Sequence, residues 1–426
     1  MFSRGNDNPN VCVMETKAIA IRLWGEVLGY LSWDEHKRCS LFVFEDSFLK
    51  TNWDVAPLYC SIHSPSALLP RRGIVEKLYA GLPPFVADSL PDRWGNRVFD
   101  AWAKRNGIVS RNLTALDRLS FIGKRGMGAL EFEPAQLLTG EEMPIPVAEL
   151  YHLAMAIQEE RQDVWLKGEG NIFLEDLYRV GTSVGGKRAK AVIAMNKDRV
   201  IRSGQAELPA DYIHYILKFN DDKVFPFSEV EYAYYLMACS AGITMMPSSL
   251  MTIEGKSHFL TERFDRPKGE KLHVLTLAAM DPDADSYEDL FSVCRRLRLP
   301  ENQQRELFRR MIFNVLGCNV DDHSKNFSFV MDKQGKWSLA PAYDMLFTFD
   351  LDGPKYVNRH SLSVGIKTDG ITIDDLKAFA IENDIGHADT IIDEVKTALS
   401  KWNTFSFDAG VPKQWSERIA VELLGH

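Results

Sequence analysis

The chain has 426 residues, 45% of them hydrophobic and 26% charged, which is enough for two or three domains with sizeable cores. Its formal net charge of −9 argues against free-standing binding to nucleic acid, because phosphate neutralisation needs a surplus of clustered Lys and Arg. The six cysteines show no C-x-x-C pair and no zinc-ligand spacing, so we expect reduced thiols and neither a disulfide framework nor a zinc site.

The N-terminal region predicts a β-rich domain. Residues 1–10 are polar, and no stretch of the chain approaches roughly 18 consecutive apolar residues, so we expect no export signal, no membrane span and a cytoplasmic location. Residues 17–45 alternate apolar and polar side chains, with Gly25 and Gly29 at turns, which predicts an antiparallel meander. A linker is predicted near residues 134–145, and we therefore predict a first, mixed α+β domain over residues 1–145.

The rest of the chain changes from strands to helices. Two short apolar runs predict strands, and longer runs with apolar residues at helical spacing predict helices. The predicted strands are Ala191–Met195 and Tyr212–Phe219, and the predicted helices are residues 146–162, Glu229–Ala241, Tyr287–Leu297 and Gln303–Leu316. The fold class is thus α+β, with a second domain over residues 146–426 whose C-terminal lobe, residues 228–426, is mainly helical.

The segment Asp321-Asp322-His323-Ser324-Lys325-Asn326 carries the strongest chemical signal. It follows a long amphipathic helix and precedes an alternating strand, Phe327–Met331, so it lies on a helix-to-strand loop. Kinase catalytic loops place the Asp that orients the attacking hydroxyl five residues before an Asn that holds a metal ion, and Asp321 and Asn326 have this spacing. The alternative is an ordinary turn, in which Asp and Asn side chains bond to nearby backbone.

A hairpin after this loop predicts the second metal ligand. The strand Phe327–Met331, a turn at Asp332–Lys336 and the strand Trp337–Leu339 would return Pro341-Ala342-Tyr343-Asp344 to the side of the loop. Asp344 then takes the role of the Asp in a D-F-G segment. Mg²⁺ suits Asn326 and Asp344, because it takes hard oxygen ligands from one or two side chains and completes its shell with water and phosphate.

A kinase also needs a cation for the nucleotide phosphates. Lys218 stands near the end of the predicted strand Tyr212–Phe219, and Glu231 on the following helix could form the Lys–Glu ion pair of kinases. The alternative for Lys218 is a solvated strand end. Upstream, residues 181–190 offer a glycine-containing loop, but it matches neither G-x-x-x-x-G-K-[ST] nor G-x-G-x-x-G, so by itself it is better interpreted as an ordinary surface loop.

Taken together, these segments resemble the HipA-type serine/threonine kinases of bacterial toxin–antitoxin pairs, from about residue 17 to about residue 350. The motifs that carry the resemblance are G-E-V-L-G at 25–29, L-P-D-R-W-G at 90–95, I-G-K-R-G-M-G-A-L at 122–130, T-S-V-G-G-K-R-A-K at 182–190, E-R-F-D-R at 262–266, D-D-H-S-K-N at 321–326 and P-A-Y-D at 341–344.

The resemblance implies a two-lobed kinase-like fold of the PI3/4-kinase type, with an added β-rich N-terminal domain, a lobe hinge near residues 221–266, and ATP and Mg²⁺ as cofactors. It implies that Asp321 is the catalytic base, that Asn326 and Asp344 are metal ligands, and that Lys218 binds phosphate. The further nucleotide contacts that it implies are Ser183, Val184, Gly185, Gly186, Lys187, Glu262, Phe264 and His323. Ser183 also matches the family's inhibitory autophosphorylation site, although its hydroxyl could simply satisfy a turn.

The same resemblance implies a protein substrate, such as an aminoacyl-tRNA synthetase, and a small helix-turn-helix antitoxin through which alone DNA would be contacted. This sequence departs from the family at Lys187-Arg188-Ala189, where the family more often has a small residue, Gln, and Pro or Glu. Two other functions stay open. One is a small-molecule phosphotransferase of the aminoglycoside or choline type, and the other is a pseudokinase scaffold that acts only through a partner.

Overall fold

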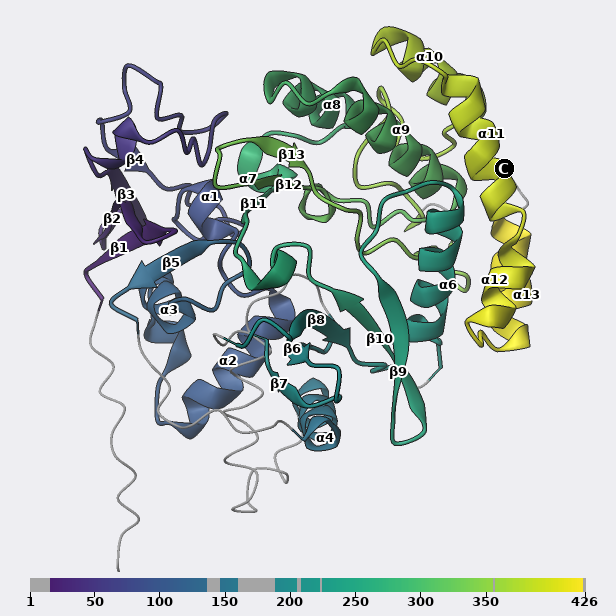
Figure 1. Ribbon diagram of the computed structural model, residues 1–426, viewed down its shortest axis with the longest axis horizontal. Coiled ribbons are helices and arrows are strands. Elements are labelled where there is room, and N and C mark those ends of the chain that lie inside the picture. The colour runs from purple at the N-terminus through teal and green to yellow at the C-terminus, as the bar shows by residue number, and fades with distance from the viewer. Residues whose placement is uncertain are drawn as a thin grey trace, which may run out of the picture.

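The structure, a computed structural model, shows an elongated molecule with a small β-sheet at one end and a helical layer at the other (Figure 1). It describes residues 16–135, 146–159, 188–204, 208–222, 224–354 and 357–423. The predicted nucleotide contacts Ser183, Val184, Gly185, Gly186 and Lys187 lie outside the described residues. Within these ranges, each helix is too short or too polar to cross a lipid bilayer.

The N-terminal sheet confirms the predicted meander. Its five strands are ordered β4-β3-β2-β1-β5, and all neighbours in this sheet are antiparallel. The strands are β1 (Ala18–Leu23), β2 (Glu26–Asp34), β3 (Cys39–Phe44), β4 (Arg71–Arg72) and β5 (Leu130–Glu133). Ile19, Ile21 and Leu23 on β1 are buried at every second position, because one face of the sheet covers a core. Strand β5 reaches the edge of β1 from more than one hundred residues further along the chain.

Four helices lie in the described chain between β4 and the next sheet. They are α1 (Pro84–Ala87), α2 (Arg93–Arg105), α3 (Ala115–Ile122) and α4 (Val147–Gln158). Trp94 and Phe99 of α2 share one hydrophobic core with Leu150 of α4 and with Ile193 and Leu217 of the second sheet. The N-terminal region is thus packed directly against the sheet that carries Lys218. The domain boundary that we predict near residue 145 stays a prediction.

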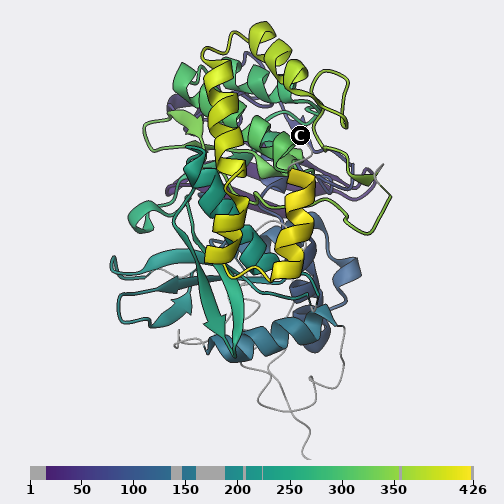
Figure 2. The same cartoon turned by 90° about the vertical axis from the view of Figure 1, so that its right-hand side faces the viewer.

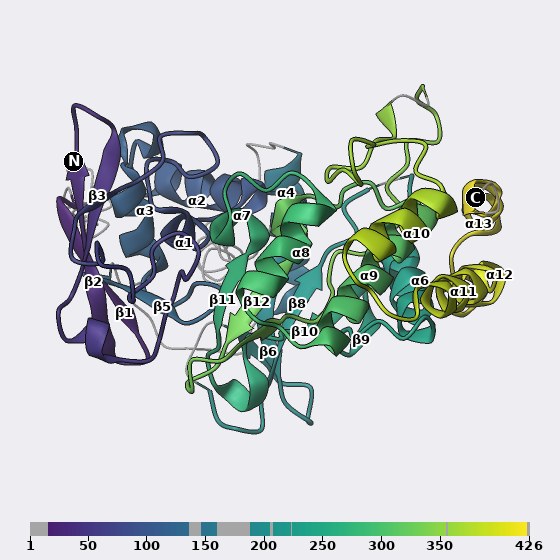
Figure 3. The ribbon, with the colours of Figure 1, turned by 90° about the horizontal axis from the view of Figure 1, so that it is seen from above.

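The central sheet is also five-stranded, in the order β7-β6-β8-β10-β9. Its strands are β6 (Lys190–Met195), β7 (Ile201–Ser203), β8 (Ile213–Lys218), β9 (Ser248–Ile253) and β10 (Lys256–Glu262), and helix α6 (Phe227–Ser240) follows β8. The two predicted strands of this region and the helix predicted over Glu229–Ala241 therefore exist, with ends that differ by a few residues. Figure 3 shows this sheet between the N-terminal sheet and the helical end of the molecule.

The C-terminal part holds a three-stranded sheet and a helical layer. The sheet is ordered β11-β12-β13, with β11 (His273–Thr276), β12 (Ser328–Met331) and β13 (Trp337–Leu339). The helices are α7 (Leu277–Met280), α8 (Tyr287–Arg296), α9 (Glu301–Leu316), α10 (Ile373–Glu382), α11 (Ala388–Leu399), α12 (Trp402–Asp408) and α13 (Lys413–Leu423). The hairpin of β12 and β13 and the helices α8 and α9 confirm the predictions. The last helices, yellow in Figure 2, form one outer face of the molecule.

A buried ion cluster joins the N-terminal region to the end of β10. Asp265 is fully buried and accepts hydrogen bonds from Arg263, from Arg266 at 2.5 Å and from the backbone N–H of Gly128 at 2.9 Å. Arg266 also donates to the carbonyl groups of Gly126 and Gly128, at 3.0 and 2.9 Å. The E-R-F-D-R and I-G-K-R-G-M-G-A-L motifs therefore meet in space, and their role in these contacts is to hold two parts of the fold together.

Replacing Asp265 by asparagine is expected to destabilise the protein by about 3–5 kcal/mol, because two buried guanidinium groups lose their counter-charge. Burial alone would raise the pKa of Asp265, but Arg263 and Arg266 outweigh it and the pKa is lowered. The stabilisation is therefore complete above the ordinary carboxyl pKa of about 3.9 and is lost as the pH falls below it. Urea unfolding of both proteins at neutral and acidic pH measures this difference.

The matched control is Glu301→Gln, which removes an exposed ion pair with Arg305 and should change the unfolding free energy by less than about 1 kcal/mol. Equal urea midpoints for the wild type and the Asp265 variant at neutral pH would show that the buried cluster does not stabilise the fold.

Candidate active site

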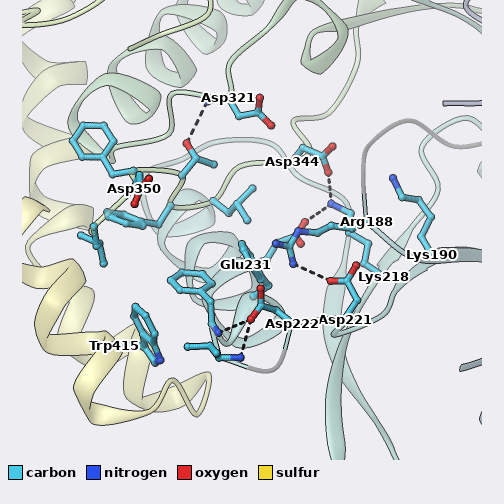
Figure 4. A pocket seen from close by; sticks show the side chains of 18 of the residues that line it. Arg188, Lys190, Lys218, Asp221, Asp222, Glu231, Asp321, Asp344, Asp350 and Trp415 are labelled. Carbon is cyan, nitrogen blue, oxygen red and sulfur yellow. Dashed lines mark hydrogen bonds and ion pairs between the residues drawn. The ribbon is translucent and has the colours of Figure 1, made fainter. Parts of the chain in front are cut away.

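A cavity of about 750 Å³ lies between the central sheet, the loop before α6 and the loops that follow α9 and β13 (Figure 4). Four predicted site residues line this cavity, and so does the predicted ion-pair partner of Lys218. The site residues are Lys218, Asp321, Asn326 and Asp344, and the partner is Glu231. His323 lines it as well. These residues are spread over more than one hundred positions of the sequence, so the fold, and not local sequence, brings them together.

The loop that follows helix α9 presents Asp321 to the cavity. The side chain of Asp321 is half exposed, and its carboxylate lies 3.8 Å from Nε2 of the His323 imidazole. The Asn326 side-chain nitrogen donates to the backbone oxygen of Asp321 at 2.6 Å. The amide nitrogen is thereby engaged, and the amide oxygen of Asn326 is the remaining acceptor for a cation.

The neighbouring carboxylate has a different environment. The side chain of Asp322 is fully buried and accepts hydrogen bonds from the Tyr287 hydroxyl at 2.7 Å, from His360 Nδ1 at 2.9 Å and from the Ser361 backbone N–H at 2.7 Å. This carboxylate has no exposed surface and does not line the cavity, so a substrate hydroxyl in the cavity cannot reach it. Of the two adjacent aspartates, only Asp321 is placed to meet a substrate.

Lys218 at the end of β8 is held between two carboxylates. Its ammonium forms ion pairs with Glu231 of α6 and with Asp344, as the dashed lines of Figure 4 show. Burial lowers the pKa of Lys218, but Asp344 and Glu231 outweigh it, so the pKa is raised and the lysine stays charged. For Asp344, burial acts in the opposite direction and raises the pKa. The charges of Lys218 and Lys190 outweigh burial, so the pKa of Asp344 is lowered. The predicted Lys–Glu pair is therefore present.

Asp344 has a left-handed backbone, with φ of 53°. This conformation is unfavourable for most residues with a Cβ atom but is tolerated by Asp and Asn. Asp344 follows Tyr343, whose hydroxyl bonds to the backbone oxygen of Lys325 at 2.8 Å and to Ser328 at 2.6 Å. These bonds fix the segment after β13 against the loop that follows α9, and the hairpin thereby brings Asp344 to the cavity.

Lys190 is a site residue that the sequence did not indicate, except as a partner for a phosphate on Ser183. It lies on β6 directly opposite Lys218, is 2% exposed and lines the cavity. Two like charges at facing strand positions repel each other, so they need carboxylates or another anion nearby. Asp92 supplies one carboxylate, 3.4 Å from the Lys190 ammonium, and Trp94 donates to the Lys190 backbone oxygen at 2.9 Å. Burial lowers the pKa of Lys190, and Asp92 opposes this effect.

Asp92 is also the N-cap of helix α2, where its carboxylate accepts the N–H of Gly95 at 2.5 Å. The L-P-D-R-W-G motif therefore starts a helix of the N-terminal region, and its Asp92 also contacts the Lys190 ammonium of the central sheet. An Asp before a helical pattern was the available signal, but its contact with a lysine almost one hundred residues away could not be derived from it.

Glu262 and Phe264 lie at the end of β10 and beyond it, and neither lines this cavity. Glu262 is opposite Tyr215 in the sheet, and its N–H donates to the backbone oxygen of Pro247 at 3.0 Å. The Phe264 ring stacks on the ring of Tyr343, with centroids 5.7 Å apart. Tyr343 is the residue that precedes Asp344 in the sequence. Their predicted contacts with adenine stay a prediction.

Oxygen donors suited to a metal ion are present, although sparse. Within the described ranges, no three His, Cys, Asp or Glu side chains are grouped to form a metal-binding cluster. The Asp344 carboxylate and the Asn326 amide oxygen, which border the same cavity, match a hard cation that takes few protein ligands and keeps water and phosphate in its shell. The residues thus fit Mg²⁺ and give no set for a zinc ion.

Comparison with known proteins gives two family matches. Residues 19–133 match the family described as "HipA N-terminal domain", and residues 182–402, more than half of the chain, match the family described as "HipA-like C-terminal domain". The protein "Putative kinase Y4mE" of Sinorhizobium fredii is 25% identical over 353 residues, which are 77% of this chain and 77% of that protein. The protein "Putative kinase" of Haemophilus influenzae is 32% identical over 154 residues, which are 31% of this chain and only 45% of that protein.

A solved structure of HipA from Shewanella oneidensis, in complex with HipB and its operator DNA, is similar over 96% of this chain and 97% of that chain. The TM-score is 0.66 and the sequence identity is 15%, so the likeness shows the fold. It confirms the α+β class with a β-rich N-terminal domain before the kinase-like part.

Proposed function

Because the chain belongs to the HipA family, we propose that it is an ATP-dependent serine/threonine protein kinase that transfers the γ-phosphoryl group to a protein hydroxyl. The observation that supports this proposal is the convergence on one cavity of Lys218 with its partner Glu231, of the half-exposed Asp321, and of the oxygen donors Asn326 and Asp344. The named kinases among the relatives support the same reaction class.

Each residue has a role that follows from its surroundings. Asp321 accepts a hydrogen bond from the attacking hydroxyl and orients it, because its carboxylate is half exposed and lines the cavity. Lys218 and Lys190 provide positive charge for the phosphates. Asn326 and Asp344 would hold Mg²⁺, which when bound neutralises phosphate charge. Binding of an anionic nucleotide gives the facing lysines a counter-charge in addition to the protein carboxylates.

The substrate and partner are proposed from the family resemblance. A translation component such as an aminoacyl-tRNA synthetase would supply the hydroxyl, and a small helix-turn-helix antitoxin would bind the kinase. The Shewanella relative was solved with its HipB antitoxin and operator DNA. The net charge of −9 favours DNA contact through such a partner over contact by this chain alone.

Incubation of the purified protein with radiolabelled ATP and Mg²⁺ tests the proposed function. We expect label on protein, in the kinase itself or in an added cell extract, and its loss when Mg²⁺ is chelated. Transfer of label to small molecules alone would indicate a small-molecule phosphotransferase, and no ATP consumption under any of these conditions would indicate a scaffold.

We also propose that Ser183 is autophosphorylated and that this inhibits the enzyme. A phosphoserine carries about −1.5 to −2 charges at neutral pH and repels the ATP phosphates, and it can pair with nearby basic side chains such as Arg188 and Lys190. After incubation with Mg-ATP, peptide mass spectrometry should find phosphate on Ser183 in the wild type and none in an Asp321→Asn variant. A homogeneous Ser183-phosphorylated protein that binds ATP as tightly as the unmodified protein would contradict self-inhibition.

A further inference from the structure

The chain after Asp344 contacts the proposed catalytic loop, residues 320–326, at two points. Near its start, the Thr348 hydroxyl accepts the backbone N–H of Val320 at 2.7 Å and that of Asp321 at 3.2 Å. At the second point, the Asp322 carboxylate accepts hydrogen bonds from His360 Nδ1 and from the Ser361 N–H, as described above. Thr348 also borders the cavity that Asp321 faces.

We propose that Thr348 is a positioning residue for Asp321, so that the segment after Asp344 sets the catalytic carboxylate in place. The inference rests on the proposed kinase function, since it assigns how the catalytic loop of that site is held. Thr348 does not contact Asp321 through the carboxylate. Its hydroxyl accepts the N–H groups of Val320 and Asp321, which belong to the two peptides that flank Val320, and thereby fixes the backbone from which the carboxylate projects.

Two features separate this role from ordinary packing. The segment from Asp344 to Phe349 has neither helical nor strand structure, so no regular ladder fixes its register against the loop. The bond to the Asp321 N–H is exposed, so water could replace Thr348 as its acceptor, whereas the bond to the Val320 N–H is part-buried. The bond to the Asp321 N–H is thus not required to satisfy a buried donor, and its effect is to define where the backbone lies. The Thr348 N–H donates to the Cys318 oxygen at 3.1 Å, which holds the threonine itself in place.

The position of the carboxylate matters because transfer requires an oriented hydroxyl. A displacement of a catalytic group by about 1 Å can cost roughly 10²-fold in rate. Nucleotide binding depends instead on Lys218, Lys190 and the oxygen donors Asn326 and Asp344, none of which Thr348 contacts. Loss of the hydroxyl should therefore lower kcat and leave KM for ATP nearly unchanged.

The test uses Thr348→Val, which keeps the shape of the side chain and removes the hydroxyl, and Thr348→Ser, which restores it. We expect kcat of the valine variant to fall roughly 10–100-fold, with KM for ATP changed less than about threefold, and the serine variant to stay within about threefold of the wild type. Hydrogen exchange should be faster in the valine variant for the peptide that contains residues 318–326.

The matched control is Thr372→Val, which removes the hydroxyl that caps α10 by accepting the Asp375 N–H at 3.3 Å, away from the cavity. It should lose similar local stability without any change in kcat. A valine variant at 348 with wild-type kcat and unchanged exchange at residues 318–326 would overturn the inference while leaving the kinase function intact. An inactive wild type would overturn the proposed function itself, whereas unchanged exchange alone would still refute the role of Thr348.

Discussion

Replacing Asp321 by asparagine is expected to reduce phosphoryl transfer by roughly 10²–10⁴-fold, the range that a positioned general base contributes. Mg-ATP should still bind with nearly wild-type affinity, because the proposed role of Asp321 is to contact the acceptor hydroxyl and not the phosphates or Lys218. Phosphate incorporation from labelled ATP measures the first effect, and calorimetry with Mg-ATP measures the second. Asparagine keeps the size of the side chain, so the fold should be preserved.

The geometry sharpens how this result would be interpreted. Retained activity could otherwise be assigned to the neighbouring Asp322, but that carboxylate is buried and bound to three donors. Near-full activity of the Asp321 variant would therefore count against the kinase function as proposed. Asp332→Asn is a suitable control, because Asp332 accepts backbone N–H groups in the turn between β12 and β13 and does not line the cavity. Its activity should equal that of the wild type.

Local patterns were sufficient for most individual elements of the fold. The alternation over residues 17–45 and the helical spacing in Gln303–Leu316 predicted β1 to β3 and α9, because the period of buried side chains is a property of the local sequence. The pairing of β5 with β1 and of β11 with β12 was not predicted. Both pairings join segments that are far apart in sequence, and alternation alone does not specify which edges meet.

The candidate site divides in the same way. Lys218, Asp321 and Asn326 could be selected because a kinase requires these residue types at a strand end and at a fixed spacing in a loop. Asp344 could be added because a hairpin is short enough to return it. The contacts of Lys190 with Asp92 and of Thr348 with the Asp321 N–H depend on how separate elements pack, and no spacing within the sequence encodes them.

The C-terminal helices show a limit of a different kind. Trp402 and Trp415 are both buried in the core. Trp415 nevertheless also borders the cavity, where it lies 5.0 Å from the Phe225 ring, and Arg418 on the same helix pairs with Asp352 at 2.6 Å. Helix α13 therefore contributes to the wall of the site, although residues 351–426 carry no motif that indicates it.

The second large effect concerns Asp344, whose carboxylate has two tasks. It pairs with Lys218, and it is the only carboxylate among the two proposed Mg²⁺ ligands. When its charge is removed, Lys218 keeps Glu231 as a partner, so the lysine remains compensated. The loss should therefore fall mainly on the metal. Alanine would add backbone strain at a φ of 53°, whereas asparagine tolerates this conformation and removes only the charge.

We expect Asp344→Ala and Asp344→Asn to lose Mg²⁺-dependent ATP binding and, with it, phosphoryl transfer, because the triphosphate charge is left poorly neutralised. Calorimetric titration of ATP with and without Mg²⁺ should show that the metal strengthens binding to the wild type and has little effect on either variant. The alanine variant alone should also be less stable in urea. Unchanged Mg-ATP affinity in the asparagine variant, at wild-type stability, would remove Asp344 from the proposed metal site and leave Asn326 without its carboxylate partner.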